Sequence, residues 1–257
     1  MTIRASTTAD MGEVAALVRA SFAERLHPFM TYAQSGIAAF LGAITEHPLL
    51  FPGHRLLTCE DAGGRVTGFA EFRVDGQNGL LSYICVAPAA RRSGLAKRMI
   101  ANFLSENSGL TRLDLDVFEE NEPAIHLYEQ LGFAGMDRSL WLTRHLPAPA
   151  EGNAQPVNPA GALAAYVRYG FCEMPVRYNA RSHRLGRIGA RTLRCFEAED
   201  FGDEALLAAV RHLLPELDIA LLISPADQAQ RWNGQNVNVS RRMSLDLRAR
   251  LSAGAAT

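Results

Sequence analysis

The sequence lacks several features that would assign a chain to a familiar class. Its 26 Lys and Arg residues nearly balance 27 Asp and Glu, so charge gives no support to a nucleic-acid partner. No apolar run is long enough to cross a bilayer, and Met1–Asp10 has no apolar signal core. The four cysteines, Cys59, Cys85, Cys172 and Cys195, form no C-x-x-C pair, so we expect neither disulfides nor a zinc site. Together these absences predict a cytoplasmic protein with no membrane contact and no metal.

The length of the chain favours two domains. It has 257 residues, of which 48% are hydrophobic, enough for a sizeable core. Residues 147–158 are rich in proline and small residues and show no periodicity, as is typical of a linker. We therefore expect a first domain over residues 1–147, a linker over 148–158 and a smaller α/β domain over 159–257.

Hydrophobic periodicity in the first 147 residues predicts mixed helices and strands. The expected strands are residues 2–5, 55–59, 66–74, 80–86, 112–118 and 138–145. The expected helices are residues 11–22, 36–45, 94–105 and one that follows Asn121. Asp10 is placed to cap the first helix, and Gly132 is placed to end the last one.

The stretch from Ile84 to Met99 is the most informative part of the sequence. It begins as an apolar strand, passes through a loop of small and basic residues, and continues as a helix. Such a loop binds anions, because backbone N–H groups at a helix N-terminus lack intrahelical partners and the helix dipole adds positive charge. Gly94 allows close approach of the backbone, and Arg91 and Arg92 supply charged donors. The pattern indicates a diphosphate held by main-chain groups.

Two motifs in this sequence resemble those of the GNAT (N-acetyltransferase) superfamily. The first, Arg-x-x-Gly-x-Ala from Arg91, is similar to the family's pyrophosphate loop, usually (Arg/Gln)-x-x-Gly-x-(Gly/Ala). The second, Asn-x-x-Ala-x-x-x-Tyr-x-x-x-Gly-Phe from Asn121, matches the family's later motif. The motifs have the family's order and about its spacing, so the resemblance covers residues 1–147. It implies an α/β fold with a central mixed, largely antiparallel sheet flanked by helices.

The resemblance also implies how acetyl-CoA is bound. Backbone groups near Ile84 and Val86 would pair with the pantetheine arm, where this strand splays from the next. Asn121 matches a residue that helps orient the arm, and it can also cap the helix that follows. The residues that would hold the diphosphate are Arg91, Arg92, Ser93, Gly94, Leu95 and Ala96.

Tyr128 matches the tyrosine that protonates the departing coenzyme A thiolate. A phenol suits this role, because its reference pKa of about 10 lies above that of an alkyl thiol. The structural alternative is a half-buried helix tyrosine.

The general base is less defined by the sequence. Glu71 alternates with Phe72 on an expected central strand, so it could face the cleft and take the ammonium proton through water. The alternative is a solvent-facing carboxylate paired with Arg73 or a neighbour. Tyr83 and Asp116 are rival bases. Cys85 raises the idea of a covalent acetyl-cysteine, although a buried strand cysteine is the favoured interpretation.

The acceptor site is indicated by an aromatic segment, His27-Pro-Phe-Met-Thr-Tyr32. In the family resembled, the connection between the first two helices forms one wall of the acceptor pocket. Phe29, Tyr32 and Tyr83 are therefore candidate substrate residues. The alternative is that Phe29, Met30 and Tyr32 pack a junction between helices. With no acidic cluster to receive a polycation, the segment favours a small, weakly charged amine.

The second half lacks a phosphate loop, but its element order is similar to the first. Expected helices cover residues 160–169, 204–214 and 226–232, and expected strands cover 171–178, 184–188, 191–197, 219–223 and 243–251. Sliding residues 116–146 onto 221–251 aligns several identical residues, among them Ala124 with Ala229 and Leu142 with Leu247. We interpret residues 159–257 as a degenerate GNAT-like domain, with an unrelated α/β appendage as the alternative. Residues 197–204 carry five acidic side chains, so we expect no second coenzyme there.

The sequence as a whole predicts an acetyl-CoA-dependent N-acetyltransferase. A primary amine of a small molecule would attack the thioester directly in a ternary complex, with no metal. The second domain would form a wall of the acceptor site or build a homodimer. Two alternatives are a protein lysine or N-terminal acetyltransferase and a non-catalytic acyl-CoA-binding module.

Overall fold

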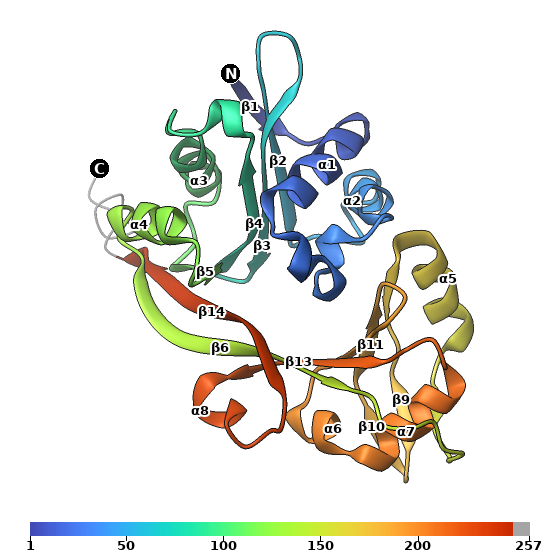
Figure 1. Cartoon of the computed structure of the whole chain (residues 1–257). Helices are drawn as coiled ribbons and strands as arrows, with labels where there is room; N and C mark the ends of the chain where they lie inside the picture. The colour runs from blue at the N-terminus through green and yellow to red at the C-terminus, as the bar shows by residue number, and fades with distance from the viewer. Residues whose placement is uncertain (249–257) are drawn as a thin grey trace. The chain divides into compact units, whose positions relative to one another are not determined.

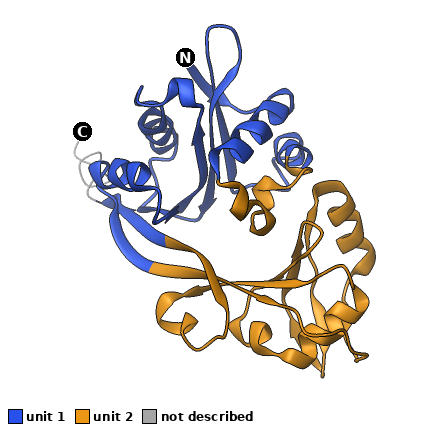
Figure 2. Cartoon of the chain, viewed as in Figure 1, with its two compact units in different colours: residues 1–22, 38–137, 241–257 blue, residues 23–37, 138–240 orange. Residues whose placement is uncertain are grey.

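The computed structural model describes residues 1–248, and the chain divides into two compact units (Figures 1 and 2). Unit 1 comprises Met1–Phe22, Ala38–Asp137 and the chain from Arg241 onward. Unit 2 comprises Ala23–Ile37 and Arg138–Ser240. Within residues 1–248, no helix has both the length and the apolar character needed to span a membrane.

Unit 1 is built on a sheet with the strand order β1-β2-β3-β4-β5-β14. Strands β1 to β4 pair antiparallel, and β4 pairs parallel with β5. The strands are β1 (Thr2–Ala5), β2 (His54–Glu60), β3 (Val66–Asp75), β4 (Asn78–Val86), β5 (Arg112–Phe118) and β14 (Gln235–Asp246), which ends in this unit. The helices are η1 (Thr8–Asp10), α1 (Met11–Ser21), α2 (Ile37–Glu46), η4 (Pro88–Ala90), α3 (Leu95–Glu106) and α4 (Glu122–Gln130). This mixed, largely antiparallel sheet flanked by helices confirms the predicted fold class.

Helices cover both faces of the unit 1 sheet, with α1 and α2 on one face and α3 and α4 on the other (Figure 1). The apolar positions of α3 recur at helical spacing, and they bury Met99 and Phe103 in the core beside α4. Phe103 stacks on Phe72 of β3 with ring centroids 3.9 Å apart. Burying a side chain of this size contributes roughly 1.5–3 kcal/mol, so α3 is firmly fixed to the sheet.

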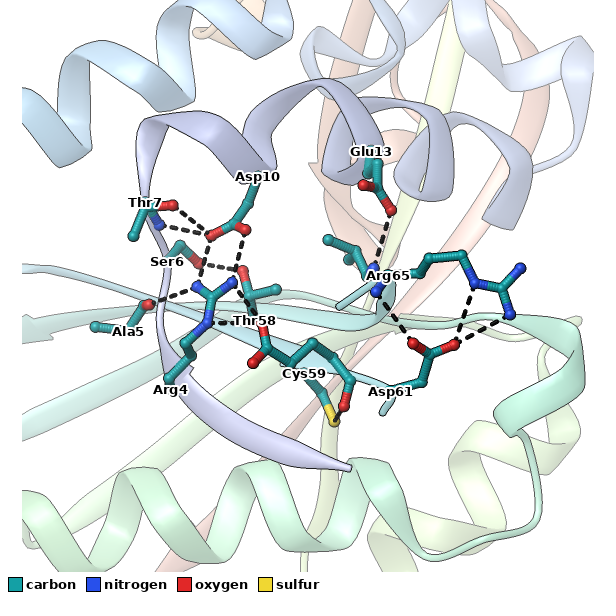
Figure 3. A network of polar contacts seen from close by, with 12 residues as sticks. Arg4, Ala5, Ser6, Thr7, Asp10, Glu13, Thr58, Cys59, Asp61 and Arg65 are labelled. Carbon is teal, nitrogen blue, oxygen red and sulfur yellow. Dashed lines mark hydrogen bonds and ion pairs between the residues drawn. The ribbon is translucent and has the colours of Figure 1, made fainter. Parts of the chain in front are cut away.

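A polar network ties the start of the chain to the sheet edge (Figure 3). The Arg4 guanidinium donates to both Asp10 carboxylate oxygens, each at 2.8 Å, and to Glu60 at 2.7 Å. Asp10 also accepts the Thr7 backbone N–H at 2.7 Å. These bonds hold the pKa of Asp10 at about 2, chiefly through Arg4. The predicted cap of α1 by Asp10 is wrong, because the carboxylate turns back to Thr7 and Arg4.

Unit 2 has a main sheet in which β14 is followed by β6-β13-β12-β11-β8, and a second sheet of order β10-β9-β7. The strands are β6 (Ala134–His145), β7 (Gln155–Pro156), β8 (Phe171–Glu173), β9 (Val176–Tyr178), β10 (Arg181–His183), β11 (Leu185–Ile188), β12 (Thr192–Cys195) and β13 (Ile219–Pro225). The helices are η2 (Glu24–Phe29), η3 (Thr31–Ala33), α5 (Pro159–Tyr169), α6 (Ala198–Gly202), α7 (Glu204–Leu213) and α8 (Ala226–Ala229).

The strand pairing in unit 2 repeats the pattern of unit 1. Antiparallel pairs of β8 with β11 and of β11 with β12 are followed by the parallel pair of β12 with β13. The next strand in each sheet comes from the other half of the chain. β5 is flanked by β14 in unit 1, and β13 is flanked by β6 in unit 2.

The compact units differ from the predicted segments in how the chain is divided. Unit 2 includes Ala23–Ile37, and β6 and β14 each begin in one unit and end in the other (Figure 2). The predicted linker, 148–158, is folded onto unit 2: Ala154 is buried in its core, and Val157 N–H donates to the Pro175 carbonyl. Small apolar residues give no periodic signal, yet they can pack closely.

Two predicted strands also differ from the structure. The expected strand over 171–178 is broken between β8 and β9, where Pro175 has no N–H to donate. The expected strand over 243–251 begins eight residues earlier, at Gln235, and ends at Asp246. Residues 249–251 of that prediction lie outside the described residues.

Candidate active site

The unit 1 sheet opens between β4 and β5. The register of these parallel strands runs from Asn78↔Arg112 to Leu81↔Leu115 and stops there. At the same level β4 has a bulge in its pairing with β3. Glu71 is paired with Tyr83, whereas the next residue of β3, Phe72, is paired with Leu81. The extra residue, Ser82, bends β4 at this point. The backbone of β4 from Ser82 to Val86 is therefore directed away from β5, as the sequence led us to expect around Ile84 and Val86.

The loop after β4 forms an anion cradle at the start of α3. Arg92 and Gly94 both have left-handed backbone conformations, with φ of 59° and 73°. Among the described residues, the backbone N–H groups of residues 92–97 find no acceptor, and the first bond of the helix is Arg98 N–H to the Gly94 carbonyl. Alternating left-handed residues turn successive N–H groups toward one side. Such a nest is suited to phosphate oxygens.

Side chains fix the shape of this loop. Ser93 Oγ donates to the Ala90 carbonyl at 2.6 Å, and Arg91 Nε donates to the Val86 carbonyl at 3.2 Å. Leu95 is buried in the core and anchors the first turn of α3, whereas Ala96 is half-buried. The six residues that we expected to bind the diphosphate thus run without a break from the loop into the first turn of α3.

Tyr128 projects from α4 into the core and is only 5% exposed. Burial raises its pKa well above the usual value for a phenol, and the nearby Cys85 thiol adds to the shift. Asn121 begins this helix, and its Oδ1 accepts the Ala124 N–H at 3.3 Å. Asn121 therefore has the capping role that we considered, and the Tyr128 hydroxyl is a protonated donor beside β4.

The Cys85 thiol is buried on β4, and burial raises its pKa to about 11. The Ser21 hydroxyl and the charge of Arg91 only partly oppose this effect. A nucleophilic cysteine requires a thiolate at working pH. The site therefore favours the interpretation of Cys85 as a neutral, packed strand cysteine.

Glu71 lies on β3 beside the bulge of β4 and has no exposed side-chain surface. Its Oε1 is 2.8 Å from Nδ1 of His54 on β2 and 3.4 Å from Nε of Arg73. The carboxylate is paired with Arg73, as one of our alternatives expected, but it is buried and does not face solvent. Asp116, a rival base, is held by both nitrogens of Arg242 at 2.8 and 2.7 Å.

Aromatic rings gather where β4 and β5 separate. The Phe22 ring, at the end of α1, meets Tyr83 of β4 and Phe118 of β5 edge-on, with both centroid distances 5.9 Å. Tyr83 is thus next to the bulge. The sequence analysis did not single out Phe22, Phe118 or His54. Phe22 was marked only as the end of an expected helix, and Phe118 only as the end of an expected strand that flanks the opening. His54 carried no signal.

The other two candidate substrate residues belong to unit 2. Tyr32 is only 3% exposed, as expected if it packs a junction. Phe29 lines a pocket of about 490 Å³ within unit 2, together with residues of β6, β13 and the segment before β14. Tyr83, Glu71, Tyr128 and the anion cradle therefore belong to unit 1, whereas Phe29 and Tyr32 belong to unit 2.

Residues 17–133 match the model of the acetyltransferase (GNAT) family. These residues span α1 to α4 and include the cradle, Glu71 and Tyr128. Over these residues the chain is similar to the GNAT acetyltransferase family, as the two motifs predicted.

Relatives of known sequence and structure extend this result. The catalytic subunit NAA20 of the N-terminal acetyltransferase B complex of Arabidopsis thaliana is 37% identical over 82 residues, which are 29% of this chain and 47% of that protein. The match thus spans about half the length of this curated relative.

Two solved structures are similar to the whole chain. A tandem GNAT protein from the clavulanic acid biosynthesis pathway has a TM-score of 0.64 at 13% identity, with 96% of this chain and 98% of that chain covered. A GCN5-related N-acetyltransferase from Sphaerobacter thermophilus has a TM-score of 0.61 at 11% identity, with 96% and 95% covered. At such low identity these likenesses establish the fold alone.

Proposed function

We propose that this protein is an acetyl-CoA-dependent N-acetyltransferase that acts on the primary amine of a small molecule. The observation that carries the proposal is the opening between β4 and β5, with an anion cradle after one strand and a protonated tyrosine after the other. The pantetheine arm would lie along Ile84 and Val86, where β4 has left β5. The diphosphate would accept hydrogen bonds from the backbone N–H groups of residues 92–97. Arg91 and Arg92 would lie at the rim of the cradle.

The proposed reaction is direct attack of a neutral amine on the thioester carbonyl. As the C–N bond forms and the C–S bond breaks, the coenzyme A thiolate takes the Tyr128 proton. The raised pKa of Tyr128 keeps this proton in place until the thiolate appears. The proton lost by the amine requires a base on the acceptor side, and the Glu71 carboxylate lies on β3 opposite Tyr83 at the bulge.

We infer that unit 2 is a GNAT-like repeat that binds no coenzyme. Its parallel pair of β12 with β13 corresponds to β4 with β5. In the turn where unit 1 has Gly94, unit 2 has Gly202, and a Cβ built there would lie 2.5 Å from the Trp232 ring. The ring therefore occupies the approach that a diphosphate would need. Five acidic residues in 197–204 oppose an anion as well.

The acceptor is proposed to be a small amine with an apolar body, because Phe22, Tyr83 and Phe118 surround the opening. A protein N-terminus is the second candidate, favoured by the 37% identity with a catalytic subunit that belongs to an N-terminal acetyltransferase complex.

An amine panel tests the function. Thiol release from acetyl-CoA would be followed with arylalkylamines, amino acids, a polyamine and a peptide with a free N-terminus. We expect amine-dependent release that is fastest with a small apolar amine. Fastest release with the peptide would establish the second candidate. Tight binding of acetyl-CoA without release for any amine would instead indicate a binding module.

A further inference from the structure

One face of the unit 1 sheet carries a row of polar side chains that runs from β2 across β3 to Tyr83 at the opening. Residues directly opposite each other in an antiparallel pair share a face, so Glu71 lies on the face of Tyr83, and His54 on the face of Arg73. Cys85, two residues from Tyr83 along β4, is also on this face, and Phe22 at the end of α1 packs against Tyr83 there.

The opposite face carries the core that contains α3 and Tyr128. Ala70 and Phe72, which alternate with Glu71 along β3, are both buried in that core. Tyr128 and Glu71 therefore lie on opposite faces of the sheet, and the opening between β4 and β5 is where the two faces meet. A thioester lying in this opening would have its proton donor on one side and its proton acceptor on the other.

Glu71 is poorly placed to take a proton from a substrate. Its side chain has no exposed surface, and its Oε1 is occupied by His54 and Arg73. The His54 side chain, by contrast, is 17% exposed. A carboxylate bonded to Nδ1 fixes the ring tautomer with the proton on Nδ1, which leaves a lone pair on Nε2. The pair is thus built so that the histidine presents a base and the carboxylate stabilises its charged form.

We propose that His54 accepts the amine proton and that Glu71 is its positioning residue. This inference rests on the proposed acetyl transfer. When the amine has attacked the carbonyl, its ammonium proton passes through water to Nε2 of His54, and the coenzyme thiolate takes the Tyr128 proton. Water then carries the proton of the imidazolium to the Tyr128 phenolate, so the enzyme returns to its starting state.

Few charged groups face the His54 ring. Glu71 and Arg73 approach it from β3, and Arg55, its neighbour on β2, donates to the His54 backbone carbonyl at 2.9 Å. The Phe51 ring packs edge-on at a centroid distance of 5.7 Å. Glu71 is the carboxylate in direct contact, so the imidazolium is stabilised mainly by this partner.

Unit 2 offers a matched control for this pair. His183 Nδ1 is 2.7 Å from Asp200 Oδ1, and the pair is also largely buried. Among the described residues, His183 Nε2 has no partner. The chemistry of the two pairs is alike, but His183 belongs to unit 2, whereas His54 shares its unit and its sheet face with Tyr83.

The test compares His54→Asn, Glu71→Gln and the control His183→Asn in the full chain. Asparagine can keep the hydrogen bond made by Nδ1 while removing Nε2. With the best amine of the panel, we expect His54→Asn to lower kcat roughly 10²–10⁴-fold, with the calorimetric Kd for acetyl-CoA within threefold of the parent. Glu71→Gln should lower kcat less, and His183→Asn should leave it within threefold. Imidazole in the medium should restore part of the rate to His54→Ala.

Several results would overturn the inference. A folded His54→Asn variant with the parent kcat would exclude His54 as proton acceptor. Loss of activity in Glu71→Gln alone would show that Glu71 acts by itself through water. If His54→Asn does not melt cooperatively, His54→Phe preserves the ring volume and gives the same comparison. Failure of the parent protein to bind acetyl-CoA would instead refute the proposed function.

Discussion

Two substitutions of Gly94 distinguish the effect of a charge in the cradle from the effect of a change in its shape. Gly94 has φ of 73° and begins α3, and a Cβ built there meets nothing within 4 Å. Asp and Asn tolerate this left-handed conformation better than other side chains, so Gly94→Asp and Gly94→Asn should carry the same backbone strain. We therefore expect their melting temperatures to agree within a few degrees.

The two variants should differ in coenzyme affinity. A carboxylate about 5 Å from one diphosphate charge, at an effective dielectric constant of about 20, is repelled by about 3 kcal/mol. This energy corresponds to a Kd for acetyl-CoA raised more than about 100-fold in Gly94→Asp. Gly94→Asn, which adds the same volume without charge, should raise Kd by less than about tenfold. Calorimetry measures both values. Equal affinity of Gly94→Asp and the parent would refute the assignment of the diphosphate site to the cradle.

Two further variants test other parts of the structure. Tyr128→Phe keeps the ring packing and removes the proton donor, so kcat should fall roughly 10²–10⁴-fold with little change in Kd for acetyl-CoA; an unchanged kcat with rate-limiting chemistry would make Tyr128 a structural residue. Asp10 has its pKa lowered to about 2 by Arg4, so the pair stabilises the fold above the unfolded pKa of about 4 and loses this effect as pH falls toward 2. Asp10→Asn should lower the free energy of unfolding in urea by about 2 kcal/mol at pH 7, and the difference from the parent should shrink below pH 4; a difference independent of pH would contradict this assignment.

The cradle and the helix of Tyr128 could be predicted from the sequence because their determinants are local. Gly94 supplies the left-handed residue at the start of α3, and Asn121 caps α4 within three residues of its own position. Periodicity then places the buried residues of α3 correctly. Each of these features depends on neighbours along the chain, which a sequence displays directly.

The parts that could not be predicted depend on distant partners. β14 takes its place beside β5 through contacts such as Ser244 with Asp114 and Arg242 with Asp116, more than 100 residues apart in sequence. His54 gave no signal, because its partner Glu71 lies on the next strand of the sheet. Residues 148–158 were predicted to be a linker, and their packing within unit 2 was missed for the same reason.

Calorimetric titration of the parent chain with acetyl-CoA decides whether unit 1 holds one complete coenzyme site and unit 2 holds none. The predicted result is one acetyl-CoA bound per chain, with the binding heat abolished or strongly reduced in Gly94→Asp. A stoichiometry of two, or a titration of the folded protein with no binding heat at several temperatures, would contradict it.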